Sequence, residues 1–365
     1  MKPRLLFIGN FLPAGSPSLS RAMGERLQES GYSVIFSSRH LGKPLRLLDM
    51  LWTAVARKQH YDVTHLDVFS GPAFIWAETV AWTLRRLGKP YILTLRGGNL
   101  PGFAVRWPGR VHSLLRTAAA VTAPSPYLQR AFLPVRGDTQ LLPNPIELSR
   151  YPFRRRETCS PRLVWLRAFH EIYDPRMAIE VLSDLRKQGM EATLCMVGPD
   201  KGDGSLQRTQ AKAQELHVEK WVEFSGQIAK ENVPVWLNRG DIFLNTTTVD
   251  NTPVSVIEAM ACGLPVVTTN VGGIPELLCD GEEGLLVPSG DAIAMTRAIT
   301  SLLQNPELAK RLSLAARKKV EAFDWSVILP QWEKLLTEVA RKPMPRPDYG
   351  TTRLRTTDHK AAIDN

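Results

Sequence analysis

The sequence lacks the short signatures of several common catalytic classes. It has no Gly-x-x-x-x-Gly-Lys-Ser/Thr phosphate loop, no Gly-x-Ser-x-Gly nucleophile turn, no His-Glu-x-x-His zinc motif and no EF-hand loop. The predicted first strand is not followed by the Gly-x-Gly-x-x-Gly turn of dinucleotide-binding domains. These absences disfavour a P-loop nucleotidase and an enzyme that binds a dinucleotide through that turn.

Cysteine and histidine are both scarce. The four cysteines, Cys159, Cys195, Cys262 and Cys279, are far apart, and the seven histidines show no metal-ligand spacing. We therefore expect reduced, mostly buried thiols in a cytoplasmic protein and no metal site.

Long apolar runs are also missing. No stretch of about 18 uncharged apolar residues exists, so no transmembrane helix is predicted. The apolar run from Leu5 to Ile8 is too short for a secretory signal and is better interpreted as a first strand.

The charge of the chain is unevenly distributed. The 365 residues include 46 Lys and Arg and 36 Asp and Glu, a net charge of +10. Residues 1–160 carry +13, residues 161–340 carry −6 and the remainder carries +3. The length predicts two domains, and the contrast in charge predicts that the two domains have different partners.

Short apolar runs alternate with helical patterns along the whole chain, which predicts an α/β fold of two doubly wound parallel sheets. We expect an N-terminal domain over residues 1–155, a C-terminal domain over 156–324 and a flexible basic tail over 342–365. The polar, proline-bounded stretch 154–161 is interpreted as the interdomain linker. One helix is expected over 103–117 and another over 325–341, the latter packing back on the first domain.

The expected helix 44–59 carries an apolar stripe. Leu45, Leu48, Leu51, Trp52 and Val55 recur at helical spacing, with Arg46, Arg57 and Lys58 beside them. One interpretation is docking to an anionic membrane surface, or to a lipid-linked diphosphate acceptor. The other is that the stripe packs on the sheet and the charge serves solubility. Nucleic acid is not an expected partner, because no recognition motif for it appears.

One segment, residues 250–267, combines acidic residues with a helix start. It is predicted as loop, helix, glycine stop and strand, with Pro253 at the first helical position. The free N–H groups of Val254, Ser255 and Val256 would then suit phosphate oxygens. Asp250 and Glu258 could hold the hydroxyls of a sugar nucleotide; alternatively, Asp250 caps the loop and Glu258 is a solvated helix residue.

This segment and its continuation resemble the retaining GT-B glycosyltransferases of family four, also called group 1. The resemblance is carried by Glu258–Val267, Gly272–Glu276 and Gly284–Pro288, with weaker similarity at 142–146, 197–199 and 224–228. It implies two Rossmann-like domains facing an interdomain cleft. It also implies transfer of a sugar from a nucleoside diphosphate sugar to a glycan or lipid-linked acceptor, in bacterial-type polysaccharide or glycolipid biosynthesis.

The resemblance also implies roles for individual residues. Glu258 corresponds to the glutamate that binds the donor ribose, Asp250 to one near the sugar hydroxyls, and Arg167 to the arginine that pairs with the diphosphate. Asp250 is one methylene shorter than the usual glutamate, and Ile172 stands where the family has a lysine. The expected donor-binding positions are Gly15, Gly198, Gln227, Ile228, Thr252, Val254, Ser255 and Glu258.

In the first domain, Arg96 stands where the family commonly has a histidine. Arginine cannot act as a base, because its pKa stays above about 12. We expect Arg96 to position an anionic acceptor or to stabilise phosphate charge; a structural ion pair is the alternative.

The family resemblance favours a front-face reaction with retention at the anomeric carbon and no cofactor. No metal-binding acidic motif is evident, so we expect no requirement for a divalent ion. The expected location is cytoplasmic, with peripheral association at the inner face of the membrane. Two other hypotheses remain: a sugar-nucleotide epimerase or hydrolase, and a non-catalytic scaffold with the same fold.

Overall fold

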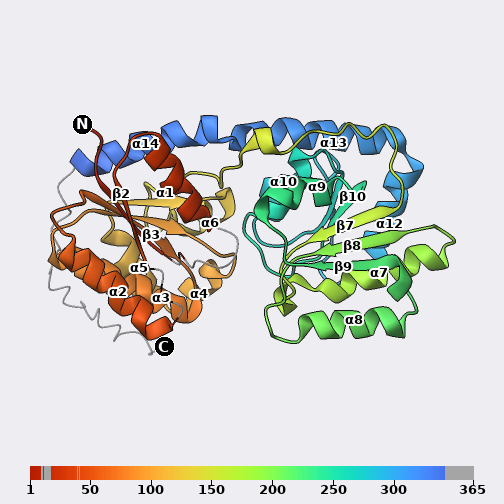
Figure 1. Ribbon diagram of the computed structural model, residues 1–365, viewed down its shortest axis with the longest axis horizontal. Helices are drawn as coiled ribbons and strands as arrows, with labels where there is room; N and C mark the ends of the chain where they lie inside the picture. The colour runs from red at the N-terminus through yellow and green to blue at the C-terminus, as the bar shows by residue number, and fades with distance from the viewer. Residues whose placement is uncertain (10, 12–17, 39, 41, 342–365) are drawn as a thin grey trace, which may run out of the picture.

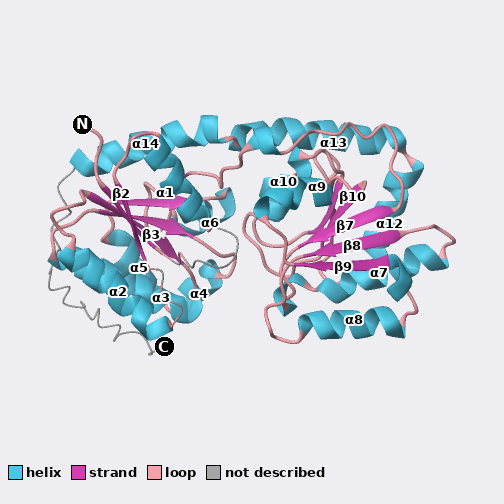
Figure 2. Cartoon of the chain, viewed as in Figure 1, coloured by secondary structure: helices cyan, strands magenta, loops and turns pink. Residues whose placement is uncertain are grey.

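The computed structural model describes residues 1–9, 11, 18–38, 40 and 42–341. They form two α/β units, each with a parallel six-stranded sheet that has helices on both faces (Figures 1 and 2). The first sheet has the order β2-β1-β3-β4-β5-β6 and the second the order β12-β11-β10-β7-β8-β9. The predicted fold class is confirmed. The strands are β1 Leu5–Ile8, β2 Val34–Ser37, β3 Val63–Val68, β4 Tyr91–Leu95, β5 Ala120–Ala123, β6 Gln140–Leu141, β7 Arg162–Leu166, β8 Thr193–Val197, β9 Val222–Gly226, β10 Ile242–Asn245, β11 Val266–Thr269 and β12 Leu285–Val287.

The connections between parallel strands contain helices, as parallel pairing requires. The first unit has α1 Leu19–Glu29, α2 Lys43–Ala56, α3 Phe74–Arg86, α4 Leu100–Arg106, α5 Pro108–Arg116 and α6 Pro126–Phe132. The second has α7 Pro175–Lys187, α8 Ser205–Glu215, α9 Val233–Leu237, α10 Val254–Ala261, α11 Ile274–Leu277, α12 Ala292–Gln304 and α13 Pro306–Val320, and α14 Trp325–Arg341 follows. Single 3-10 turns lie at Gly71–Ala73, Leu148–Arg150, Glu171–Tyr173, Glu219–Trp221, Lys230–Asn232 and Glu321–Phe323.

The chain passes between the two units twice, once after β6 and once between α13 and α14. Helix α13 packs on the second unit, whereas α14 buries Ile328 and Trp332 in the same core as Phe7 of β1 (Figure 1). The two passages are joined by backbone hydrogen bonds, because Ile146 donates to Phe323 and accepts from Trp325. The end of α14 is therefore part of the first unit's core.

The prediction of one helix over residues 103–117 is wrong. The segment forms α4 and α5, separated at Trp107, whose φ of −132° and ψ of 56° are not helical. Pro108 explains the break, since proline lacks an N–H and disfavours the helical conformation of the residue before it.

The stretch 154–161 is anchored to the second unit. The prediction of a polar linker did not include this attachment. The buried Arg156 guanidinium donates to the carbonyls of Cys262, at 2.8 Å, and Gly240, at 3.1 Å. A guanidinium loses its hydration on burial, and these carbonyls replace it.

The cysteines are free, but the expectation that most are buried is wrong. Only Cys262 is buried, Cys159 and Cys195 are half-buried, and Cys279 is exposed. Along the described part of the chain, no helix has both the length and the apolar character needed to cross a bilayer.

Candidate active site

Most of the predicted donor-site residues lie at one edge of the second sheet. Arg167 follows β7, Gly198 follows β8, Gln227 follows β9, and Asp250 lies in the loop after β10. The strand order places β7 beside β10 although they are distant in sequence, so the connections diverge between these two strands. Open parallel sheets bind ligands at the carboxyl ends of their strands where the connections diverge.

Arg167 and Asp250 meet across this divergence point as a direct ion pair (side chains 12% and 14% exposed). The Arg167 guanidinium also lies over the ring of Tyr173, 4.0 Å from its centroid. The remaining Asp250 oxygen accepts from the N–H of Asn251 at 2.8 Å. Burial lowers the pKa of Arg167, and nearby Tyr173 and Glu258 oppose that shift. An arginine remains charged here, so the site holds a largely desolvated positive charge beside one carboxylate.

Two buried donors at this edge have no hydrogen-bond partner among the described residues: Nε of Arg167 and Oγ of Ser255. Ser255 is in the first turn of α10, whose N-cap is Pro253. The N–H groups of Val254 and Ser255 are likewise unpartnered within the described chain, as expected at a helix start. Unpaired buried side-chain donors are costly, and the free amides of a helix start favour anions. Because Arg167 pairs with Asp250 in the loop that leads to α10, these donors together suggest an anionic ligand at this edge.

Two details of the predicted helix start are wrong. Pro253 lies one position earlier than expected, at the N-cap with φ −66° and ψ 115°. The N–H of Val256 is not free, because it donates to the Pro253 carbonyl at 3.1 Å. The tight first turn thus removes one of the three predicted phosphate-binding amides.

Glu258 is buried inside α10, and one of its carboxylate oxygens has two partners, so its interpretation as a solvated helix residue is wrong. Its carboxylate accepts from the hydroxyl of Tyr151 at 2.6 Å and forms an ion pair with Lys230. Burial and this carboxylate raise the pKa of Tyr151 well above its usual range, so the phenol stays protonated and donates. The exposed fraction of Glu258 is only 3%, which a carboxylate tolerates when it has two such partners.

Tyr151 and Lys230 were not predicted as site residues. Tyr151 lies after the first passage between the units, where the sequence gives no chemical motif. Lys230 lies three residues beyond Gln227 in the segment after β9. Its place at a carboxyl-end loop is the signal that could have identified it.

The predicted position of the family lysine holds no cation. The Ile172 carbonyl accepts from the Thr248 N–H at 2.8 Å and from two threonine hydroxyls, which fixes this turn to the loop after β10. The Ile172 side chain is 40% exposed. Lys230, paired with Glu258, is a second cation at this edge.

The position after β8 requires a glycine for steric reasons. Gly198 has a φ of 149°, and a Cβ there would lie 1.8 Å from the carbonyl oxygen of Arg167. Any other residue would displace Arg167. Two further predicted donor-binding residues follow β9. Gln227 is exposed, and Ile228 packs against the core beside α10.

The loop that carries Asp250 also touches the first unit. Ser125 donates to the side chain of Asn251, and the Thr252 hydroxyl donates to the Pro124 carbonyl at 3.5 Å. Gly98 packs so closely on Asp250 that a Cβ would approach its carbonyl to 2.6 Å. Thr252, predicted to bind the donor, thus directs its hydroxyl to the first unit.

Arg96 has an ion-pair partner, as the alternative interpretation expected. Its Nε donates to Asp67 at 2.9 Å and its Nη1 to the Asn144 side chain at 2.6 Å. Burial opposes ionisation of Asp67, but the charges of Arg96 and His65 and two hydrogen bonds hold its pKa below its usual value. Asn144 in turn donates to the Thr252 carbonyl at 3.4 Å, so this network connects the two units.

One predicted position, Gly15, lies outside the described residues, as does the expected tail 342–365.

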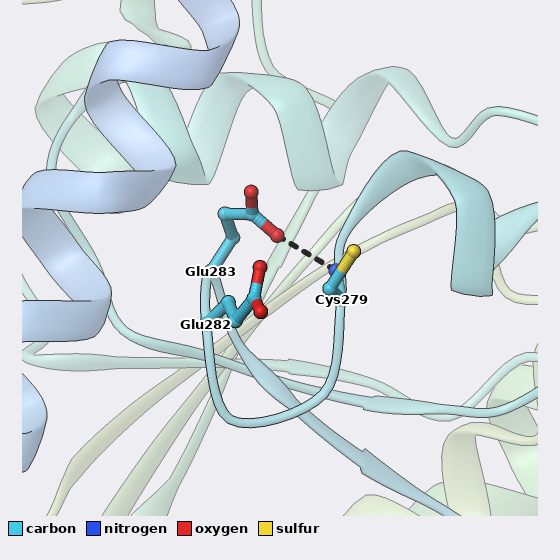
Figure 3. A group of neighbouring side chains, drawn as sticks. All are labelled: Cys279, Glu282 and Glu283. Carbon is cyan, nitrogen blue, oxygen red and sulfur yellow. Dashed lines mark hydrogen bonds between the residues drawn. The ribbon is translucent and has the colours of Figure 1, made fainter.

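A group with metal-ligating atoms occurs elsewhere. Its members, Cys279, Glu282 and Glu283, lie on a single loop (Figure 3). Glu283 accepts from the Cys279 N–H at 2.7 Å and pairs with Lys319 at 3.2 Å. The loop leads into β12 and therefore lies at the amino ends of the strands, opposite Arg167. It is not part of the candidate site.

Comparisons with known proteins show what the chain is similar to. The family model described as glycosyl transferases group 1 matches residues 160–319. A phosphatidyl-myo-inositol mannosyltransferase of Mycobacterium leprae is 27% identical over 288 residues, 77% of this chain and 74% of the relative. Other curated relatives match over shorter segments, between 32% and 53% of their own length.

Solved structures share the fold over almost the entire chain. Sucrose-phosphate synthase from Thermosynechococcus elongatus superposes with a TM-score of 0.79 at 20% identity, covering 93% of this chain and 99% of that one. The HepE protein of Anabaena, solved in complex with UDP-glucose, gives 0.73 at 18% identity, covering 92% and 100%. The chain therefore has the GT-B fold, its residues 160–319 match the model of glycosyl transferases group 1, and its relatives are named glycosyltransferases, consistent with a hexosyltransferase.

Proposed function

We propose that this enzyme transfers a hexosyl group, with retention of anomeric configuration, from a nucleoside diphosphate sugar to a glycan or lipid-linked acceptor. The pathway we propose is polysaccharide or glycolipid biosynthesis. The observation that carries the proposal is the set of unpartnered donors at the divergence point: Arg167 Nε, Ser255 Oγ and the first amides of α10. A diphosphate would satisfy all of them.

The leaving group is the hard part of this reaction. Departure of the nucleoside diphosphate develops negative charge on its terminal oxygens. Preorganised donors aimed at such charge contribute about 10²–10³-fold in rate each. Arg167 supplies one desolvated cation, and the helix start supplies amides and a dipole of the same sign.

Donor binding would exchange partners within the site. The diphosphate would take the Arg167 guanidinium, which Asp250 holds in the structure, and the freed Asp250 carboxylate would accept from hydroxyls of the sugar. Glu258 would accept from the ribose hydroxyls while Tyr151 and Lys230 keep it oriented. HepE of Anabaena, solved with UDP-glucose, supports a uridine diphosphate sugar as the first donor to test.

The proposed route to retention is a front-face displacement. The acceptor hydroxyl attacks the anomeric carbon on the face from which the diphosphate leaves. The bond to the diphosphate oxygen breaks, and that oxygen takes the acceptor proton. We propose that no divalent ion is required, because the cations and amides of the protein meet the leaving-group charge.

The donor can be identified by a thermal-shift screen of nucleoside diphosphate sugars. A ligand at 100 times its Kd stabilises a protein by about 2.7 kcal/mol, which raises Tm by several degrees. Transfer is then measured with and without EDTA, and the product anomer is determined by NMR. An inverted product would refute retention, and donor consumption without acceptor would favour an epimerase or hydrolase.

A further inference from the structure

Helix α2 carries apolar side chains on two opposite faces. Met50 and Ala54 are buried against the first sheet, with Leu47 and Leu51 packed beside them. Leu45, Leu48, Trp52 and Val55 occupy the other face and are exposed, Trp52 by 72%. The alternative that the predicted stripe packs on the sheet therefore holds only for Leu51.

The neighbouring helices extend this exposed surface. Ile75 and Trp82 of α3 are exposed, as are Val105 of α4 and Trp107, which separates α4 from α5. Helices α2, α3 and α4 lie on one side of the first sheet, and α1 and α14 on the other (Figure 1). We call these eight side chains on α2, α3 and the α4–α5 junction the outer apolar face. Single exposed apolar residues are ordinary, but a group across three adjacent helices marks an interaction site.

Two of the three tryptophans of this face lie beside arginines. Arg86 lies over the Trp82 ring at 5.2 Å from its centroid, and Arg106 lies over Trp107 at 5.8 Å. Lys43 precedes the outer stripe of α2, and Arg57 and Lys58 follow it. Tryptophan beside arginine or lysine is the combination typical of the interface between a membrane and water.

The segment that carries the outer apolar face is predominantly basic. Residues 43–116 contain eleven basic and four acidic side chains. The acidic groups already have partners: Asp49 accepts from Ser37, Asp62 pairs with Arg4, Asp67 with Arg96, and Glu78 with Arg110. A cavity of about 360 Å³ between α3 and α5 is lined by Trp82 and by two of these eleven basic residues, Arg85 and Arg110.

We propose that the outer apolar face docks the enzyme on an anionic lipid bilayer, with α2 lying in the plane of the interface. The apolar side chains would enter the boundary between headgroups and acyl chains, and the basic side chains would contact the headgroups. A second copy of the chain is a poorer occupant, because two such faces carry the same charge. Docking rests on the exposed face and not on the proposed reaction.

The position of the face suits an acceptor held in the membrane. This last inference, unlike docking itself, rests on the proposed function. Helix α4 begins at Leu100, two residues beyond Gly98, whose backbone packs on Asp250. The outer apolar face thus includes Val105 of the helix that begins beside the donor site, so that a lipid-linked acceptor could approach the sugar along α4.

The test is co-sedimentation of the full chain with vesicles of phosphatidylcholine alone and of phosphatidylcholine with about one third phosphatidylglycerol. We expect binding to the second only, weakened by salt. Leu48→Ser with Trp52→Ser should reduce the partition coefficient at least tenfold. Arg57→Gln with Lys58→Gln should reduce it about thirtyfold, or about 2 kcal/mol at about 1 kcal/mol per basic residue.

Matched controls come from the second unit. Val235→Ser with Ile293→Ser removes exposed apolar side chains, and Lys187→Gln with Lys201→Gln removes exposed charges. These variants should bind vesicles as the wild type does. Equal binding by the α2 variants, or equal loss in the controls, would overturn the proposal, as would wild-type binding that ignores phosphatidylglycerol.

A donor-binding measurement on the same variants separates the two proposals. The α2 variants should retain the thermal shift produced by a nucleoside diphosphate sugar, which also shows that they are folded. Loss of vesicle binding with an intact donor shift supports docking. Intact vesicle binding by a wild type that shows no shift with any donor would leave docking standing and refute the proposed reaction.

Discussion

The two units each place an arginine–aspartate pair where they meet, and the pairs differ in how completely their atoms are satisfied. In the first unit, Arg96 donates to both Asp67 and Asn144. In the second, Arg167 pairs with Asp250 but keeps a buried Nε without a partner among the described residues. Both side chains follow a central parallel strand and are similarly buried.

The difference between the pairs separates structural charge from charge kept for a ligand. A buried pair that leaves no buried donor without a partner, as Arg96 and Asp67 do among the described residues, holds the protein together, because removal of one member leaves the other uncompensated. A pair with an unused buried donor carries a cost that a ligand can remove. By this criterion Arg96 belongs to the structure of the first unit, and Arg167 to the donor site.

The largest effect on stability is expected from Arg96→Ala. It leaves the Asp67 carboxylate buried without its cation, which costs about 3–5 kcal/mol of unfolding free energy. Urea denaturation of the purified variant measures this loss. Arg96→Ala combined with Asp67→Ala should recover part of it, because no unpaired charge remains. An unfolding free energy equal to that of the wild type, with transfer abolished, would instead make Arg96 a catalytic residue.

Arg167→Ala should act on transfer. Loss of one preorganised cation at the leaving group is expected to lower kcat/KM by about 10²–10³-fold. Arg162→Ala is the matched control, because Arg162 begins the same strand β7 and pairs with Asp241 at the opposite edge. The control should transfer at the wild-type rate. Similar losses in both variants would show that β7 is merely destabilised, and the comparison of the two pairs would fail.

The sequence was sufficient to predict the fold and the place of the second pair. Uniformly apolar strands alternating with helices predict parallel sheets, and carboxyl-end loops of parallel strands converge. The resemblance to the glycosyltransferase motif then placed Arg167, Asp250 and Glu258 at this edge before any coordinates were known. The motif around Glu258 added a family and a ligand class.

The remaining features depend on packing that spacing does not encode. Whether the Val256 amide is free depends on how tightly the first turn of α10 closes. The partner of Arg96 depends on where Asp67 of β3 lies in the adjacent strand register. Tyr151 reaches Glu258 from a segment 107 residues away, so only the folded chain brings the two together.

The folding stability is expected to depend on pH through a histidine in the core of the first unit, and this effect is slightly smaller than that of Arg96→Ala. His65, two residues before Asp67, is fully buried, and burial lowers its pKa from 6.5 to about 4 against the charge of Asp67. Below pH 6.5 His65 is protonated in the unfolded chain, whereas in the folded chain it stays neutral until about pH 4. Folding stability should therefore fall by about 3 kcal/mol as the pH decreases across this window.

Denaturation curves at several pH values between 4 and 6.5 measure this dependence. His65→Gln keeps a polar side chain near Thr94 but does not titrate, so the slope assigned to His65 should disappear. An unchanged slope in the variant would assign the acid sensitivity to other groups. Arg167 keeps its charge across this window and does not contribute to the slope.

The smallest effect expected is that of Tyr151→Phe, which tests whether the second unit's site depends on the passage between the units. The variant removes the hydroxyl that donates to Glu258 at 2.6 Å and leaves Lys230 as the carboxylate's partner. A hydrogen bond to a charged group contributes about 1.5 kcal/mol or more, so donor KM should rise about tenfold. Because Glu258 is proposed to hold the ribose and not the reacting carbon, kcat should change little.

Tyr91→Phe removes a comparable hydroxyl, bonded to Thr117 at 2.8 Å in the first unit, and should leave both constants unchanged. A fall in kcat with unaltered KM for Tyr151→Phe would mean that the passage controls movement of the units, and that Glu258 keeps its orientation without the tyrosine.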